Sequence, residues 1–226
     1  MHESQILEEA RKNFARNSQP RCACLLLLDT SASMEGAPIN ALNRGLQTFK
    51  EELMKDNLAS KRTQVAIVTF DSEVKVVHDF VDADQFNPPT LTAPGFATNM
   101  ASAIQKALDM IQARKTVYKS CGIQYYRPWI FLITDGQPTE DSEIVERAAQ
   151  RVKDAEVNKQ VVFYAVGVEG ANMTRLAQIV SDPLPLEGLN FEALFQWLSA
   201  SMGAVSQSNP REPVQIPLPS KWIRLE

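Results

Sequence analysis

The chain has 226 residues, of which 44% are hydrophobic and 22% are charged, enough for one sizeable core but short for two full domains. The formal net charge of -4 and the lack of a basic run argue against nucleic-acid binding. The longest apolar run is too short to cross a bilayer, and the N-terminus lacks an apolar signal core, so we expect a cytoplasmic protein with no membrane contact.

Segments of strand and helix character alternate from residue 22 onward. Runs that are apolar on both faces are typical of central strands in a parallel sheet, and one alternating run is typical of an exposed edge strand. These strands are predicted at 22–28, 63–70, 73–80 (the edge strand), 128–134 and 160–168. Apolar residues spaced three or four apart predict amphipathic helices. The helices are predicted at 39–53, 100–111, 142–156, 172–180 and 190–202.

This alternation predicts an α/β fold, with a doubly wound, mostly parallel sheet, helices on both faces and one antiparallel edge strand. The main domain is expected over residues 21–205. An N-terminal extension over residues 1–20 fits either an amphipathic helix, through Ile6, Ala10 and Phe14, or a mobile segment.

The C-terminal arm, residues 206–226, is rich in Pro and Ser and carries Trp222 and Ile223 near its end. Proline disfavours helix and removes backbone donors from a strand ladder, so we expect an extended arm. Its apolar end predicts docking, either onto the protein itself or onto a partner. A disordered tail is the alternative.

The sequence LDTSASM follows the first predicted strand and places Asp29, Ser31 and Ser33 at alternate positions. Alternate residues of an extended chain point the same way, so one carboxylate and two hydroxyls can face a single point. Asp135 follows another apolar strand. In doubly wound sheets, ligands bind beyond the carboxyl ends of the strands where the strand order reverses, so the two carboxylates share one crevice if these strands are neighbours there.

Oxygen ligands of this kind suit magnesium, calcium or manganese rather than zinc or copper. If only one carboxylate binds directly, the cation keeps net positive charge and attracts a carboxylate from outside. The pattern therefore favours recognition over catalysis. The alternative is structural, because Asp and Ser after a strand commonly form turns or cap helices.

These motifs resemble those of von Willebrand factor A domains. DTSAS fits the D-x-S-x-S signature of their metal-ion-dependent adhesion site, and TDG fits the aspartate of a later loop. The resemblance covers roughly residues 21–205. It implies a divalent cation bound by four residues of these motifs, namely Asp29, Ser31, Ser33 and Asp135. A threonine from a third loop completes the set.

The matching threonine is Thr98 in PGFATNM, just before the second major helix. Relatives carry Gly-Gly-Thr or Gly-Ser-Thr in this loop, whereas this chain has the longer Gly95-Phe96-Ala97-Thr98. The departure leaves the path of the loop open, with Thr92 as the alternative ligand. Mg²⁺ is the expected ion, and Ca²⁺ or Mn²⁺ suits the same oxygen ligands.

Four segments together resemble bacterial A-domain proteins of tellurium-resistance-type gene clusters: LDTSASMEGAPINALNRGL, VTFDS, RPWIFLITDGQPTED and FQWLSASM. The resemblance implies a metal-dependent protein–protein interaction in which the cation binds an Asp or Glu of the partner. It further implies partners encoded nearby, phosphosignalling proteins among them, and a role in tellurite or other stress responses or in phage defence.

An enzyme is the less favoured alternative. Haloacid-dehalogenase-type phosphoryl-transfer enzymes need a second aspartate two residues after the first as acid and base, and this chain has Ser31 there. The sequence also lacks a phosphate-cradling G-x-x-x-x-G-K-[ST] and a G-x-S-x-G elbow, so we expect no catalytic turnover. A further alternative is a scaffold of the same fold whose metal is structural and whose terminal arms contact the partner.

Several residues beside these loops have two interpretations. Phe96, Met34 and Met100 fit an apolar rim around the crevice, although the two methionines equally fit core positions in the first turn of a helix. Asp71, which follows a strand, favours a structural turn. Glu140 is expected to help start a helix by interacting with its dipole, with partner contact as the alternative.

Overall fold

The computed structural model of the protein describes residues 3–210, 212–219 and 222–223. Six strands form a single sheet in the order β3-β2-β1-β4-β5-β6. The strands are β1 Cys22–Asp29, β2 Thr63–Phe70, β3 Val74–Asp82, β4 Trp129–Thr134, β5 Val162–Gly167 and β6 Leu184–Pro185. Neighbouring strands are parallel except β2 and β3, which are antiparallel and put β3 at the edge. The doubly wound, mostly parallel sheet is confirmed.

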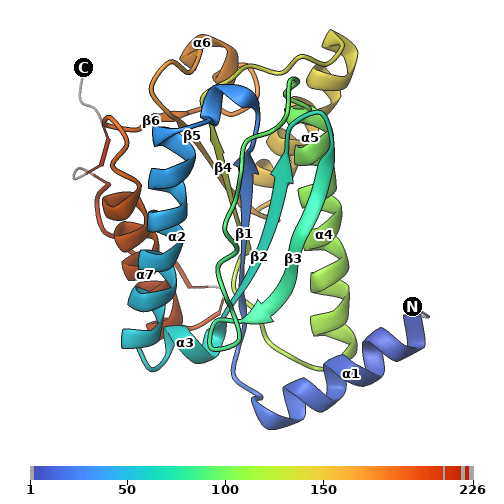
Figure 1. Ribbon diagram of the computed structural model, residues 1–226. Coiled ribbons are helices and arrows are strands. Elements are labelled where there is room, and N and C mark those ends of the chain that lie inside the picture. Colours follow the sequence, from blue (N-terminus) through green and yellow to red (C-terminus); the bar gives the residue numbers. More distant parts are fainter. Residues whose placement is uncertain (1–2, 211, 220–221, 224–226) are drawn as a thin grey trace.

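Helices cover both faces of this sheet, with α2 and α7 on one side and α4 and α5 on the other (Figure 1). The described helices are α1 Glu3–Arg16, the short 3-10 turn η1 Ala32–Met34, α2 Ala37–Lys55, α3 Ala59–Arg62, α4 Met100–Ser120, α5 Ser142–Val157, α6 Met173–Leu176 and α7 Phe191–Gln207. Among them, none is both long enough and apolar enough to span a membrane.

The side chains of β1 alternate between two cores, because successive residues of a strand face opposite sides of the sheet. Cys24, Leu26 and Leu28 join the core beneath α2 and α7. Leu25 and Leu27 join the core beneath α4 and α5. All five are fully buried, which explains why this segment is apolar throughout.

The N-terminal segment forms α1, which lies at the amino end of the sheet and contacts α4 (Figure 1). Ala10 and Phe14 are buried, and the ring of Phe14 lies 5.8 Å from that of Tyr118 in α4. This part of the extension is therefore a helix packed on the domain. The side chain of Ile6 lies outside the described residues.

The apolar end of the C-terminal arm docks on the protein's own body. Trp222 is fully buried, and its ring lies 5.3 Å from that of Trp197 in α7. The indole N–H of Trp197 donates to the carbonyl of Pro217 at 2.7 Å. Ile223 forms an antiparallel bridge with Leu186 beside β6. Between α7 and this end, the described part of the arm contains no strand or helix.

The strand order reverses between β1 and β4. From β1 the chain passes through α2 and α3 to β2, which pairs with β1 on one side. It then passes through β3 and α4 to β4, which pairs with β1 on the other side. The carboxyl ends of β1 and β4 are therefore the place where a sheet of this kind binds ligands.

Candidate functional site

Asp29, the last residue of β1, is fully buried and is held between two strand ends. Its Oδ1 accepts the backbone N–H of Ser31 at 2.8 Å, and its Oδ2 accepts the hydroxyl of Thr134, the last residue of β4. The Thr134 hydroxyl in turn accepts the N–H of Gly136 at 3.1 Å. These bonds fix the orientation of the carboxylate across the reversal point.

A chain of hydroxyls links the first motif to the loop after β4. The hydroxyl oxygens of Ser31 and Ser33 lie 3.1 Å apart, and Ser33 donates to Oδ1 of Asp135 at 2.8 Å. Ser31 is buried, Asp135 is half-buried and Ser33 is exposed. The cluster is therefore closed at the sheet and open to solvent at Ser33.

Thr98 is buried and points its hydroxyl at the same cluster. A methyl group built onto Gly136 would lie 3.3 Å from Thr98 Oγ1 and 3.5 Å from Asp29 Oδ2, so the two oxygens converge above this glycine. Thr92, the alternative ligand, is exposed, and no hydrogen bond in the described structure joins it to the cluster. The structure thus brings together the whole expected set: Asp29, Ser31, Ser33, Thr98 and Asp135.

The loop after β4 also positions Thr98. The Thr98 N–H donates to the Thr139 hydroxyl at 3.0 Å, and the Thr139 N–H donates to the Thr98 carbonyl at 3.1 Å. Glu140 accepts the N–H groups of Ala101 and Ser102 at 2.6 and 2.8 Å, which caps the start of α4. Glu140 therefore does start a helix, but that helix is α4 and not α5, which follows it in the sequence.

Residues 95–99, which we call the Thr98 loop, are fixed to the first motif. Ala32 donates its N–H to the carbonyl of Gly95 at 2.6 Å. A side chain on Gly95 would meet the Asp71 side chain at 2.1 Å, so only glycine permits this approach. Asp71 has the expected structural role, because it is buried and accepts the Thr30 hydroxyl and the Glu73 N–H, both at 2.9 Å.

The two carboxylates of the cluster are not paired with a positive charge in the described part of the chain. Within the described residues, neither Asp29 nor Asp135 forms an ion pair. Burial raises the pKa of Asp29, hydrogen bonds from Ser31 and Thr134 oppose the rise, and the charge of Asp135 adds to it. Burial also raises the pKa of Asp135, against the hydrogen bond from Ser33. Each carboxylate is therefore held in a place that disfavours its own charge.

The donor set suits a hard divalent cation. It offers carboxylate and hydroxyl oxygens only, the ligands that magnesium, calcium and manganese prefer, and lacks the nitrogen and sulfur ligands typical of zinc. No group of three or more His, Cys, Asp or Glu able to hold a metal occurs in the part of the chain described. A cation here would therefore depend on the hydroxyls as much as on the carboxylates.

Of the residues expected to form an apolar rim, Phe96 alone is at the surface, where the residue is 94% exposed. Met34 and Met100 are fully buried, so their interpretation as rim residues is wrong. Met34 is the last residue of the 3-10 turn η1 and Met100 is the first residue of α4, and each packs into one of the two cores. The alternative, that they are core residues, is the correct one, although only Met100 lies in the first turn of a long helix.

Three residues of the site escaped the sequence interpretation: Thr134, Gly136 and Thr139. Thr134 does leave a signal, because it is the polar last residue of the otherwise apolar strand WIFLIT. A hydroxyl at that position can reach the end of the neighbouring strand. Thr139 leaves none, since its partner Thr98 is 41 residues away in the sequence.

Comparison with known proteins agrees with this geometry. A family model described as the von Willebrand factor type A domain matches residues 25–194. The chain belongs to the von Willebrand factor type A family. Domains of this family are general protein-interaction and adhesion modules. A search among curated proteins gave no match.

Solved structures share the fold at low sequence identity. The ArnB paralog VWA2 from Sulfolobus acidocaldarius is 19% identical, with a TM-score of 0.53, over 81% of this chain and 46% of that one. A von Willebrand factor type A structure from Catenulispora acidiphila is 15% identical, with a TM-score of 0.63, over 82% and 43%. The pilus adhesin SpaC from Lactobacillus rhamnosus GG, in its open conformation, is 15% identical, with a TM-score of 0.67, over 84% and 31%. This chain thus spans less than half of each of these proteins.

Proposed function

We propose that this von Willebrand factor type A domain binds a protein partner through a divalent cation, Mg²⁺ in the first place, with Ca²⁺ or Mn²⁺ suited to the same donors. One observation carries the proposal: two carboxylates meet at the reversal point of the sheet beside three hydroxyls, and neither carboxylate forms an ion pair within the described residues. The residues that would hold the cation are Asp29, Ser31, Ser33, Thr98 and Asp135.

The neutral ligands suggest how such a site recognises a partner. Hydroxyls bring no charge, so a bound cation keeps positive charge wherever one of the carboxylates acts through water. The exposed position of Ser33 leaves that charge accessible from solvent. An Asp or Glu of the partner is the group that this charge attracts, and a charge-assisted contact in a partly dehydrated site contributes about 1.5–3 kcal/mol.

The proposal includes the absence of catalytic turnover. Ser31 occupies the position where a phosphoryl-transfer enzyme of similar fold needs its acid and base, and a hydroxyl does not titrate near neutral pH. We expect purified protein in magnesium to leave a phosphate ester such as p-nitrophenyl phosphate unhydrolysed. Hydrolysis that disappears in the Asp29→Asn variant would contradict this expectation.

The scaffold alternative, in which the terminal arms contact the partner, has less support. Phe14 of α1 and Trp222 of the arm are both buried against the domain itself. These apolar groups are therefore engaged within the chain. The proposed setting remains the one that the sequence resemblance implies, a bacterial stress-response or phage-defence system with phosphosignalling proteins among the partners.

The experiment that tests the proposal compares wild type with Asp29→Ala in pull-downs from a lysate of the source organism, in magnesium and in EDTA. We expect wild type to retain a partner in magnesium alone, and the variant to bind it about thirtyfold more weakly or worse, as measured by calorimetry with the captured protein. If the variant is folded by circular dichroism yet binds as tightly as wild type, the cation is not the recognition element.

A further inference from the structure

We propose that Phe96 is an apolar anchor for the partner, so that the partner presents an apolar pocket next to the Asp or Glu that reaches the proposed metal site. Phe96 is 94% exposed, more than any other large hydrophobic residue that the structure describes, and it is the one aromatic residue in that exposed group. Aromatic side chains gain much from burial in an interface because they are large and have few rotatable bonds.

The exposure of Phe96 does not come from a loosely held backbone. All five N–H groups of the Thr98 loop donate hydrogen bonds to other loops: to the carbonyl of Thr30, twice to the hydroxyl of Ser72, to the hydroxyl of Thr139 and to the carbonyl of Asp71. The side-chain amide of Asn99 also donates to the carbonyl of Ser72 at 2.7 Å. The ring is thus presented from a fixed backbone, which lowers the entropic cost of ordering the loop when a partner binds.

Phe96 lies within the footprint of one contact with the metal site. It stands two residues before Thr98, and two residues of extended chain span at most about 7 Å. On its other side, Gly95 forms a parallel bridge with Ser31. A single helix or loop of a partner can therefore place an acidic side chain over the cluster and an apolar pocket over Phe96.

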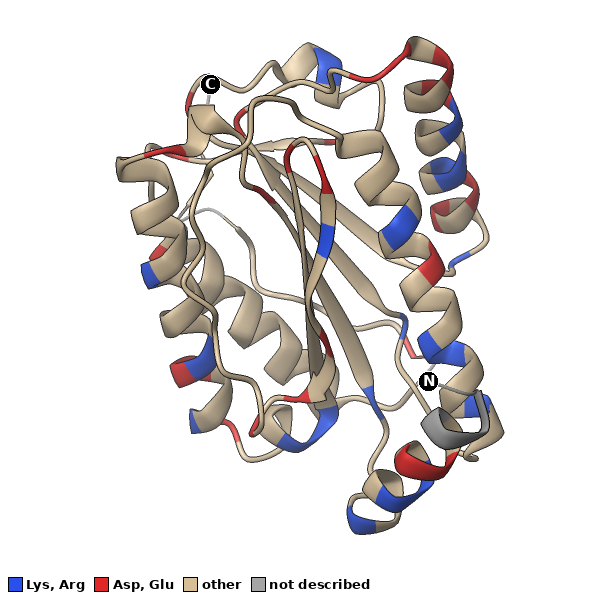
Figure 2. Cartoon of the chain, turned by 45° about the vertical axis from the view of Figure 1, so that its right-hand side comes forward, with Lys and Arg blue, Asp and Glu red and all other residues tan. Residues whose placement is uncertain are grey.

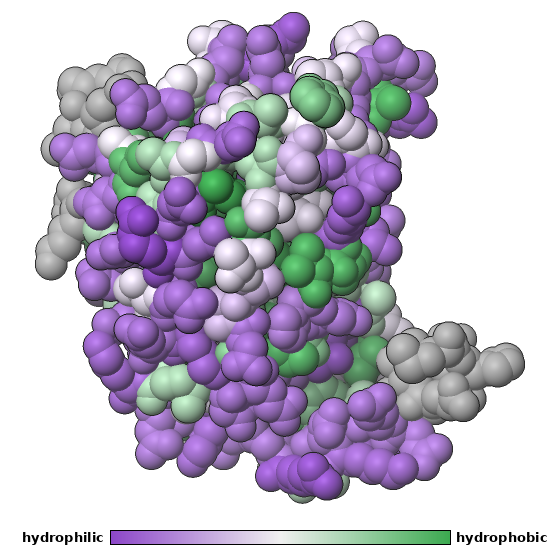
Figure 3. Space-filling view, in the orientation of Figure 1, coloured by the Kyte–Doolittle hydropathy of each residue, from purple (hydrophilic) through white to green (hydrophobic). Residues whose placement is uncertain are grey.

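Lone exposed apolar residues are common on protein surfaces, and the visible face of this molecule is mostly hydrophilic with apolar residues in scattered groups (Figure 3). What singles out Phe96 is its place on the Thr98 loop. Glu35, which follows Ser33 by two residues, is exposed. Its negative charge disfavours a generally acidic partner, so the partner segment should carry one acidic residue among apolar neighbours.

The test uses a library of disulfide-cyclised peptides with a fixed central Asp and random flanks, selected on wild type in magnesium and eluted with EDTA. We expect apolar residues to be enriched beside the Asp. Calorimetry then compares one selected peptide on wild type, on Phe96→Ala and on Val157→Ala, a control that removes another exposed apolar side chain (73% exposed) at the end of α5. Phe96→Ala should weaken binding about tenfold or more, Phe96→Leu should restore most of it, and Val157→Ala should have no effect.

The outcomes separate this inference from the proposed function on which it rests. Equal affinity of the peptide for Phe96→Ala and Val157→Ala would overturn the anchor and leave metal-dependent binding in place. If no peptide elutes with EDTA, the proposed metal site fails and the anchor fails with it. Magnesium titration of Phe96→Ala should match wild type, because Phe96 does not touch the cluster; a loss of magnesium binding would overturn the role of Phe96 as a partner contact.

Discussion

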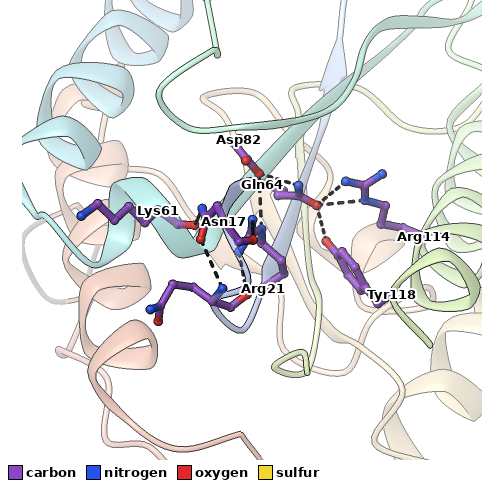
Figure 4. A network of polar contacts seen from close by, with 8 residues as sticks. Asn17, Arg21, Lys61, Gln64, Asp82, Arg114 and Tyr118 are labelled. Carbon is purple, nitrogen blue, oxygen red and sulfur yellow. Dashed lines mark hydrogen bonds and ion pairs between the residues drawn. The ribbon is translucent and has the colours of Figure 1, made fainter. Parts of the chain in front are cut away.

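Arg21, which directly precedes β1, and Asp29, which ends it, are fully buried charged residues at opposite ends of the same strand. Arg21 lies 3.4 Å from Asp82 as an ion pair and donates to the carbonyls of Gln19 and Asn17, both at 2.6 Å (Figure 4). Among the described residues, the groups that donate hydrogen bonds to the Asp29 side chain are neutral. The buried charge of Arg21 at one end of the strand is thus paired within the chain, whereas the buried charge of Asp29 at the other end is not.

The network at the amino end also connects elements that are far apart in the sequence. Asp82 of β3 accepts the side-chain amide of Gln64 in β2, and the Gln64 oxygen accepts Arg114 at 2.9 Å and the hydroxyl of Tyr118 (Figure 4). The Arg114 guanidinium lies 5.4 Å from the ring centre of Phe14 in α1. These contacts join α1, α4 and two strands, so the network serves the fold.

The contrast teaches where to look for function in such a sheet. Charges that are paired within the chain hold elements together, whereas a buried charge without its counter-charge points to a ligand. In Figure 2, Asp and Glu occur on several loops along the upper edge, where the parallel strands end, and Lys and Arg are frequent near the N-terminal end. Substitutions at the two ends of β1 should therefore have opposite consequences.

The largest effect is expected from Arg21→Ala. Removing the guanidinium leaves Asp82 without its charge partner and the carbonyls of Gln19 and Asn17 without these donors, so the free energy of unfolding should fall by about 3–4 kcal/mol, independently of magnesium. Urea denaturation measures this. Lys12→Ala, which breaks the exposed pair of Lys12 with Glu8, is the matched control and should leave stability unchanged within error. A similarly small change in the free energy of unfolding for Arg21→Ala would contradict the structural role of the amino-end network.

Asp29→Asn should behave in the opposite way. In EDTA it should be at least as stable as wild type, because it removes a buried charge without a counter-charge and keeps the shape of the side chain. Magnesium at about 100 times its Kd should stabilise wild type by about 2.7 kcal/mol and the variant not at all. Urea denaturation with and without magnesium checks both points. A variant much less stable than wild type in EDTA would make Asp29 a structural residue like Arg21.

Glu140→Gln should have an intermediate effect, on both the stability of the fold and the affinity for magnesium. The variant loses the charge that caps α4, so we expect about 1 kcal/mol less stability and a fewfold weaker magnesium binding, because α4 follows Thr98 directly. Asp141→Asn is the matched control, since Asp141 makes no side-chain cap bond at the start of α5. Equal magnesium affinity in the two variants would show that the cap does not position Thr98.

The smallest effect concerns pH. Burial raises the pKa of Asp29 and of Asp135, so without metal the native state holds protons more tightly than the unfolded chain does. The contribution of these groups to the free energy of unfolding should therefore fall as pH rises from about 4 through the raised pKa values. The stability of wild type minus that of Asp29→Asn, measured in EDTA, should become more negative over this range. A difference that is constant with pH would contradict the uncompensated charge.

Most of the fold could be predicted from the sequence, because the hydrophobic pattern of consecutive residues indicates doubly buried strands and amphipathic helices. The convergence of Asp29 and Asp135 was also predictable, since two polar residues follow two apolar strands and the α/β order makes those strands neighbours. The exact ends of the helices and the two-residue strand β6 were less predictable, because their positions depend on tertiary contacts.

The supporting contacts of the site could not be predicted in the same way. Glu140 looks like the start of the next helix by sequence, yet the fold brings it to α4, 39 residues earlier. Met34 and Met100 adjoin the ligand loops in sequence, yet both side chains are buried in the cores, Met34 from the turn η1 and Met100 from the first turn of α4. In both cases the direction of a side chain depends on packing that neighbouring residues do not encode.

The most direct test of the proposed metal site at the carboxyl end of β1 is a calorimetric titration of metal-free protein with magnesium at neutral pH. We expect wild type to bind one cation per chain and Asp29→Asn to give no binding heat, while a destabilised but folded variant at the amino end, such as Arg21→Lys, binds as wild type does. Wild type that binds no magnesium at concentrations on the order of millimolar, or Asp29→Asn that binds it as well as wild type, would contradict the account.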